Sequence, residues 1–365
     1  MDKRHFLIVA TNHTPPSLDS EIRQRRHQRV DYISLAEQLC ADYVDYRLVS
    51  DNPRLRRLEE RCRIDFRLAI KVARLVRDRG YDTVLSMSER VGIPLGWLLG
   101  RCIKHVVILH HPMSPSKISL LRRLKPHRNW SRLVFISQVE AEHFRQALNI
   151  LPERVMVLHT PVDTAFFSSD AVSAHPQNYV HSVGSSHRDY ATLIRAIREL
   201  PDIPCDFRVG SAWVNNPMDY ENEPIPSNVQ IRPYVHPSDL RRYFVESRFT
   251  IVSVRATTQW SAGCTSVQIA QSMGQAVIAT RLPGLAEYVL DGETGVLVQP
   301  RDPQGMKEAI EMLWRDPSRA KAMGRRAREW IRSQFSFERW LERIGSVLVS
   351  ACTFLIADST LMNAW

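Results

Sequence analysis

The chain lacks the sequence features of membrane-spanning, disulfide-rich secreted and zinc-binding proteins. Its six cysteines are scattered and none forms a Cys-x-x-Cys pair, so neither a disulfide framework nor a structural zinc site is indicated. No apolar run reaches the ~20 residues that a spanning helix needs. The first apolar run, residues 6–10, is also too short for the core of a signal peptide. We therefore expect a cytoplasmic protein with reduced cysteines.

Acidic residues are absent between Glu89 and Glu140, where Arg and Lys are frequent, and the whole chain carries a net charge of +10. The basic segment 117–132 leaves three interpretations open: a solvated positive surface, a peripheral contact with the inner face of an anionic membrane, or nucleic-acid binding. Residues 118–125 mix apolar and basic side chains, which is typical of interfacial segments. No zinc knuckle, helix-turn-helix or RNP signature accompanies the charge, so we expect no nucleic-acid partner.

Short apolar runs alternate with amphipathic stretches along the whole chain. This alternation predicts βαβ units and parallel sheets. The expected strands form two series, and the second series opens at residue 180. They lie at residues 6–10, 42–49, 81–86, 105–109, 133–137 and 154–158, and then at 180–183, 205–209, 229–231, 250–254, 276–279 and 295–298. The charged stretch 54–79 is expected to form one long helix that ends at Gly80.

The two series predict two domains joined near residue 170, because residues 168–178 are polar and rich in turn formers. We expect an acceptor-binding domain over residues 1–170 and a donor-binding domain over residues 171–345. The apolar C-terminal segment 346–365 is expected to pack back on the first domain. Ligands of such sheets bind beyond the carboxyl ends of the strands.

The loop after the expected strand 180–183 combines a glycine, a serine and an arginine, at Gly184, Ser185 and Arg188. The glycine allows close approach of a ligand to the backbone, and the guanidinium suits a phosphate. The alternative is an ordinary strand-to-helix turn.

A second candidate lies at residues 259–274, where a loop of small residues leads into a helix that ends at Gly274. The N–H groups that open such a helix favour anions, and a diphosphate fits. A purely structural turn is the alternative interpretation. The candidate binding residues here are Ser261, Gly263, Cys264, Thr265 and Ser266.

Several segments of the second half occur in the order and form of a known family. They read VGSSHRDYATL at 183–193, GQAVIAT at 274–280, LPGLAEYV at 282–289, PRD at 300–302 and MGRRAR at 323–328, with PVDTAFF at 161–167 preceding them. The most specific is DGETGVLV at 291–298. From about residue 130 to 345 the chain resembles the retaining glycosyltransferases of family 4, the group 1 glycosyltransferases.

The resemblance implies the GT-B fold, an α/β architecture in which two Rossmann-like, doubly wound domains face a cleft. It places a nucleotide-sugar donor mainly on the second domain, with Arg188 as the second member of a basic pair that holds the diphosphate. Ser185 occupies the position of the first member. The family also carries two glutamates near the helix start, and Ser261 and Ile269 stand in their places here.

In the first domain, His110 and His111 follow an expected strand, and the family often has a histidine there that faces the donor sugar and the acceptor. One of the two is therefore a candidate for positioning or proton transfer. A histidine that merely caps the strand end is the alternative. The resemblance implies that the leaving phosphate helps to deprotonate the acceptor. We expect no metal and no cofactor, and the chain has no Asp-x-Asp metal clamp.

The sequence thus predicts a retaining glycosyltransferase that uses a nucleotide sugar and an unidentified acceptor. Two alternatives stay open. The missing glutamates favour a catalytically weakened homologue that acts as a binding or regulatory subunit, and the fold also allows another enzyme such as a sugar-nucleotide epimerase.

Overall fold

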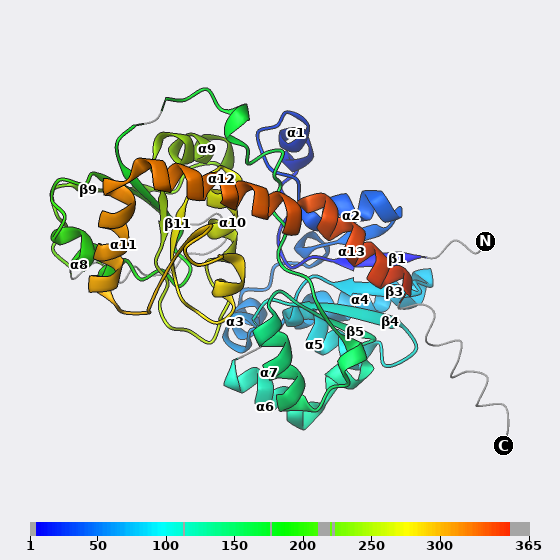
Figure 1. Ribbon diagram of the computed structural model, residues 1–365. Helices are drawn as coiled ribbons and strands as arrows, with labels where there is room; N and C mark the ends of the chain where they lie inside the picture. The colour runs from blue at the N-terminus through cyan, green and yellow to red at the C-terminus, as the bar shows by residue number, and fades with distance from the viewer. Residues whose placement is uncertain (1–4, 112–113, 176, 211–219, 221–222, 351–365) are drawn as a thin grey trace, which may run out of the picture. The chain divides into compact units, whose positions relative to one another are not determined.

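The structure is a computed structural model that describes residues 5–111, 114–175, 177–210, 220 and 223–350. The chain divides into two compact units. The first holds the N-terminal residues up to Asp19, then Arg29–His159, and the C-terminal residues from Glu338 on. The second holds Ser20–Gln28 and Thr160–Phe337. Each unit is an α/β fold built on its own parallel sheet (Figure 1).

The sheet of the first unit has the strand order β2-β1-β3-β4-β5-β6, and every neighbouring pair is parallel. The central strands are buried and mostly apolar on both faces, as is usual for parallel sheets. The strands are β1 (Phe6–Val9), β2 (Asp42–Val44), β3 (Thr83–Ser86), β4 (Lys104–Leu109), β5 (Arg132–Phe135) and β6 (Val155–Val157).

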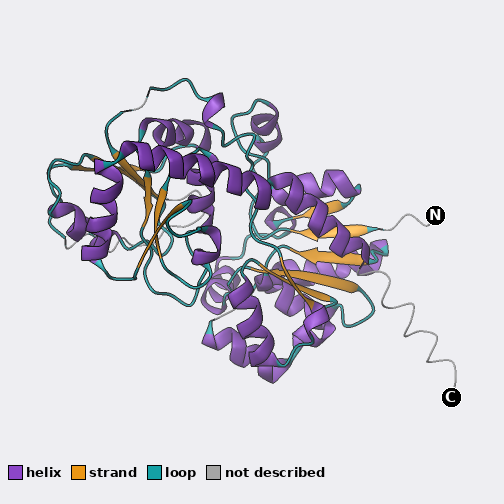
Figure 2. Cartoon of the chain, viewed as in Figure 1, coloured by secondary structure: helices purple, strands orange, loops and turns teal. Residues whose placement is uncertain are grey.

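The sheet of the second unit has the order β12-β11-β10-β7-β8-β9 and is also parallel throughout. Successive residues of a strand face opposite sides, so Val277 and Ile278 belong to separate apolar clusters. Helices cover both faces of the sheet (Figure 2). The strands are β7 (Val180–Val183), β8 (Cys205–Val209), β9 (Val229–Pro233), β10 (Thr250–Val252), β11 (Val277–Thr280) and β12 (Gly295–Val298).

The helices alternate with these strands, which gives both sheets their βαβ crossovers. In the part of the chain that the structure describes, no helix has the length and apolar character to cross a membrane. The helices are α1 (Leu18–Arg23), α2 (Asp31–Leu39), α3 (Pro53–Cys62), α4 (Phe66–Arg79), α5 (Glu89–Leu98), α6 (Pro115–Leu124), α7 (Gln138–Leu148), α8 (Tyr190–Arg198), α9 (Pro237–Glu246), α10 (Cys264–Ser272), α11 (Pro303–Arg315), α12 (Pro317–Gln334) and α13 (Phe337–Ser350).

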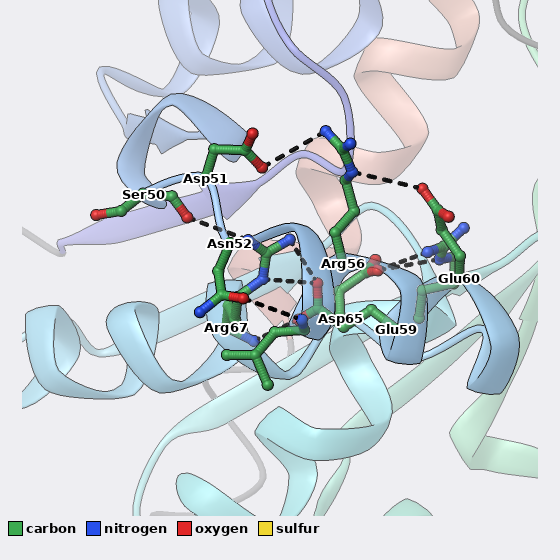
Figure 3. Close-up of polar contacts among 10 residues, drawn as sticks. Ser50, Asp51, Asn52, Arg56, Glu59, Glu60, Asp65 and Arg67 are labelled. Carbon is green, nitrogen blue, oxygen red and sulfur yellow. Dashed lines mark hydrogen bonds and ion pairs between the residues drawn. The ribbon is translucent and has the colours of Figure 1, made fainter.

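The prediction of a single long helix over residues 54–79 is wrong. The segment forms two helices, α3 and α4, separated by a short turn. Arg63 adopts the left-handed conformation, with φ at 54°, and ends α3. Glu59 then accepts hydrogen bonds from the backbone N–H and the Nε of Arg67, at 2.7 and 2.9 Å (Figure 3). Buried Asp65 accepts a hydrogen bond at 2.7 Å from Arg90, which lies beyond β3. These contacts hold the two helices as separate elements.

The C-terminal helix α13 belongs with the first unit from Glu338 on. Glu338 pairs with Arg29 at 2.6 Å, and Arg343 donates to the carbonyl of Val157 at 3.0 Å. Residues 351–365 of the predicted C-terminal segment lie outside the described residues.

Candidate functional sites

The turn after β7 brings a glycine and an arginine into contact. Gly184 has a φ of +105°, a conformation that side chains rarely adopt. A Cβ atom at this position would lie 2.6 Å from the Nη2 atom of Arg188. The Tyr190 hydroxyl donates to the Gly184 carbonyl at 2.7 Å and fixes the turn. The glycine therefore makes room for the guanidinium.

The Arg188 side chain is buried, with 5% of its surface exposed. Its Nε donates to the carbonyl of Val183 at 2.9 Å, and Nη1 donates to the carbonyl of Ser186 at 3.1 Å. Its Nη2 donates to the Ser266 hydroxyl at 2.6 Å. This last contact joins the loop after β7 to the first turn of α10, so the two regions that the sequence singled out meet at one point.

No carboxylate pairs with Arg188 among the residues that the structure describes. Burial therefore lowers the pKa of its guanidinium, which Tyr190 and Cys264 oppose only in part. A guanidinium has five N–H groups, and the three hydrogen bonds above leave two for a ligand. A buried cation without a counter-ion is costly unless an anion binds to it.

Helix α10 begins at Gly263, whose φ is +90°. A Cβ there would lie 3.0 Å from both Val252 and Val254 and 3.5 Å from Nη1 of Arg188. Within the described parts of the chain, no acceptor takes the backbone N–H groups of Thr265 and Ser266. Thr265 is exposed and Ser266 partly so. Open amides therefore lie beside the buried guanidinium, the pairing that suits a phosphate.

Three other predicted binding residues of this region, Cys264, Ser261 and Ser185, have buried side chains. Cys264 is buried, its N–H donates to the carbonyl of Ser261 at 3.1 Å, and its thiol lies 3.4 Å from the Thr160 hydroxyl. Ser261 has 2% of its surface exposed and Ser185 has 5%. Ile269 belongs to the apolar core. Neither Ser261 nor Ile269 supplies the carboxylate that the family resemblance places there.

The predicted pair His110 and His111 follows β4. The ring Nε2–H of His110 donates to the carbonyl of Met87 at 2.9 Å, and its backbone N–H donates to Glu89 at 3.0 Å. Lys117 bonds the second oxygen of the same carboxylate at 2.5 Å and the carbonyl of His111 at 3.1 Å. A buried ion pair thus holds the backbone of both histidines.

This ion pair is the feature that sequence reasoning missed. Lys117 and Glu89 are both buried, so Lys117 is not part of a basic surface. Burial alone would raise the pKa of the Glu89 carboxyl, but Lys117 and His110 lower it to about 2. A signal was present in the sequence: Lys117 precedes Leu121 by four residues, so both lie on the same, buried face of α6.

Asp31 at the start of α2 is a second acidic group near His110. Burial raises the pKa of its carboxyl, and the opposing effects include a charge interaction with His110.

Within the described residues, no group of three or more His, Cys, Asp or Glu side chains could hold a metal ion.

Comparisons with known proteins identify the family of the chain and its fold. A model of the group 1 glycosyl transferases matches residues 179–316, and a model of glycosyltransferase family 4 matches residues 2–166. The chain belongs to the group 1 glycosyltransferases. For this glycosyltransferase the sequence resemblance, the α/β class and the two-domain GT-B fold are therefore confirmed.

Curated relatives match over parts of their length. The D-inositol 3-phosphate glycosyltransferase of Corynebacterium diphtheriae is 38% identical over 24% of this chain and 21% of its own. The D-inositol 3-phosphate glycosyltransferase 1 of Catenulispora acidiphila is 28% identical over 53% of this chain and 51% of its own. The chain thus spans between about a fifth and a half of these relatives.

Solved structures match over nearly the whole glycosyltransferase chain. Anabaena HepE in complex with UDP-glucose has a TM-score of 0.70 at 16% identity and covers 95% of this chain and 99% of its own. Sucrose-phosphate synthase from Thermosynechococcus elongatus has a TM-score of 0.70 at 13% identity, covering 94% and 98%. At such identities the likeness describes the fold.

Proposed function

We propose that this chain transfers a sugar, with retention of anomeric configuration, from a nucleoside-diphosphate sugar to an acceptor hydroxyl. The observation that carries the proposal is the buried guanidinium of Arg188, which has no carboxylate partner in the described structure and lies beside the open N–H groups of Thr265 and Ser266. These groups are positioned to neutralise a diphosphate, whose charge increases as the bond to the sugar breaks.

The proposed transfer needs no redox or group-transfer cofactor, because the donor supplies the leaving group and also accepts the acceptor proton. The bond from the anomeric carbon to the diphosphate oxygen breaks, and a bond from that carbon to the acceptor oxygen forms. The acceptor proton passes to the leaving diphosphate. We propose that Arg188 and the α10 amides take the place of a metal, so transfer should persist in EDTA.

We propose that His110 positions the acceptor at the carboxyl end of β4. Its Nε2–H is committed to the carbonyl of Met87, which leaves Nδ1 as the ring atom able to accept a proton or hydrogen bond. The Glu89–Lys117 pair holds the histidine backbone in place. Positioning of this kind contributes more than proton transfer alone.

The screen for the donor covers several bases and sugars. It includes UDP-glucose, with which Anabaena HepE was solved. A thermal-shift screen with UDP-, GDP-, ADP- and TDP-sugars tests the proposal. One class should raise the melting temperature, and NMR of the product should give the same anomeric configuration as the donor. Absence of stabilisation by every nucleotide sugar would count against a donor site, and an inverted product would rule out retention.

A catalytically weakened homologue is the second candidate, because the core position of Ile269 and the buried Ser261 replace the two acidic residues of the family. It predicts nucleotide binding without transfer. Measured donor affinity together with no turnover on any acceptor, and no donor hydrolysis, would favour it. Turnover without an acceptor to an isomeric nucleotide sugar would instead indicate an epimerase.

We propose that the exposed part of segment 117–132 contacts an anionic membrane. Lys117 and Leu121 are buried, so the surface consists of Arg122, Arg123, Lys125 and Arg128. Leu124 is 45% exposed, and Trp97 beside it is 39% exposed with its indole N–H donating to the Leu124 carbonyl at 3.0 Å. Basic and apolar side chains together suit the interface of a bilayer. Sedimentation with anionic vesicles at low and high salt tests this contact.

A further inference from the structure

A cavity of about 320 Å³ lies in the first unit, between the C-terminal ends of α6 and α7. It lies where β5 and β6 begin, at the sheet edge opposite to His110, which follows the carboxyl end of β4. Its lining includes Arg122, Lys125, Arg128 and Arg154, and it includes no carboxylate.

In the part of the chain that the structure describes, none of these four cations forms an ion pair. Glu153, which is not among the lining residues, acts on Arg154 through its charge. Arg122 donates to the carbonyl of Ala147 at 3.1 Å, and Arg154 donates to the carbonyls of His127 and Trp130. The two helix C-termini together supply about one negative charge. The cavity therefore keeps a strong positive potential.

A buried histidine in the cavity wall responds to that potential. His127 is 6% exposed, and its ring Nδ1 has no hydrogen-bond partner among the described residues. Burial lowers its pKa to about 4, and Arg154, Arg128 and Lys125 act in the same direction. The ring is thus neutral at physiological pH, and the arginines and the lysine supply the positive charge of the cavity.

The ligand that fits this lining carries phosphate. Guanidinium groups bind phosphate oxygens through paired N–H groups, and a lysine adds a compact charge. Leu151 in the lining is 59% exposed, so the cavity also presents an apolar side chain to solvent. A phosphorylated headgroup or a small phosphate ester meets both requirements.

We propose that this cavity is a phosphate-binding site, separate from the nucleotide-sugar site, which takes the phosphate group of a phosphomonoester or of an anionic lipid headgroup. The proposal goes beyond sugar transfer and does not depend on the donor site. Its headgroup alternative rests on the membrane contact proposed above, because the cavity shares Arg122, Lys125 and Arg128 with that surface.

The test removes two exposed charges from the lining, in the variant Lys125→Gln/Arg128→Gln. The matched control, Arg57→Gln/Arg61→Gln, removes the same charge from exposed positions on α3 in the same unit. Arg154 is left unchanged because it donates to two backbone carbonyls. Thermal unfolding should be the same for both variants and the wild type.

Binding is measured by calorimetry with inorganic phosphate and glycerol 3-phosphate, and by sedimentation with phosphatidylcholine vesicles with and without phosphatidic acid. We expect the cavity variant to lose about tenfold or more in affinity and the control to lose less than about twofold. Loss in the calorimetric arm assigns the site to soluble phosphate esters, and loss in the vesicle arm alone assigns it to a headgroup.

Equal losses in the two variants would show a diffuse charge effect and overturn the proposal, as would absence of binding in both arms by the wild type. Affinity for the nucleotide sugar should be unchanged in both variants. A loss of donor binding alone would therefore concern the proposed function and not this cavity.

Discussion

Removal of the Arg188 guanidinium should weaken binding of the donor nucleotide in a protein that still folds. In Arg188→Ala the two N–H groups that the protein leaves unused are lost. One charge-assisted hydrogen bond contributes about 1.5–3 kcal/mol, so the affinity for the matching nucleoside diphosphate should fall by about 10- to 150-fold. Calorimetry measures this change directly.

Arg188→Ala should also change the free energy of unfolding of the unliganded protein. This change should be smaller than the loss of about 3–5 kcal/mol that follows removal of one partner of a buried ion pair. The variant leaves the carbonyls of Val183 and Ser186 and the Ser266 hydroxyl without their donor. It also removes a buried charge that has no carboxylate partner in the described structure, and these two effects oppose each other. Thermal unfolding checks that the variant is folded.

Arg188→Lys is the matched control, because it keeps the charge but not the planar set of donors. It should bind the nucleotide with an affinity between those of the wild type and Arg188→Ala. A folded Arg188→Ala protein with wild-type affinity would refute the assignment of this side chain to the diphosphate.

Further predictions concern the glycine, the buried ion pair and the histidine. Gly184→Ala should weaken nucleotide binding at least tenfold, because its Cβ would meet Arg188 and its φ is positive, and calorimetry with a circular-dichroism control checks this. Lys117→Met should destabilise the protein by about 3–5 kcal/mol in urea, and Glu89→Gln/Lys117→Met should recover part of the loss. The folded-state pKa of Glu89, about 2, lies below its ordinary 4.5, so the unfolded chain takes up the proton first. Stability from this group, on the order of 3 kcal/mol, should therefore be present above about pH 5 and disappear as the pH falls towards 2, and a pH series of urea unfolding should show less of this loss in the double variant. His110→Ala should lower kcat about 100-fold with unchanged donor affinity, and equal losses in both would mean that it is a structural cap.

The strands were predictable from the sequence because most of them are short apolar runs between polar turns, whereas β2 and β9 also carry polar side chains. The break between α3 and α4 was not, because Arg63 adopts a positive φ that usually marks glycine. The contacts that fix this break join residues far apart, such as Asp65 and Arg90. Periodicity within one segment carries no information on such partners.

The candidate donor site was predictable as two loops at strand ends, since parallel strands place their carboxyl ends at one edge. The hydrogen bond between Arg188 and Ser266 joins residues 78 positions apart, and only the fold reveals it. The role of Lys117 was misjudged because the local surplus of basic residues suggested a surface. Its helical spacing relative to Leu121 was the better guide.

Hydrogen–deuterium exchange with and without the nucleotide identified by the thermal-shift screen tests the central claim most directly. Bound diphosphate should slow exchange of the Thr265 and Ser266 amides and of the loop from Gly184 to Arg188. Saturating nucleotide that leaves these amides unprotected while protecting another region would contradict the account.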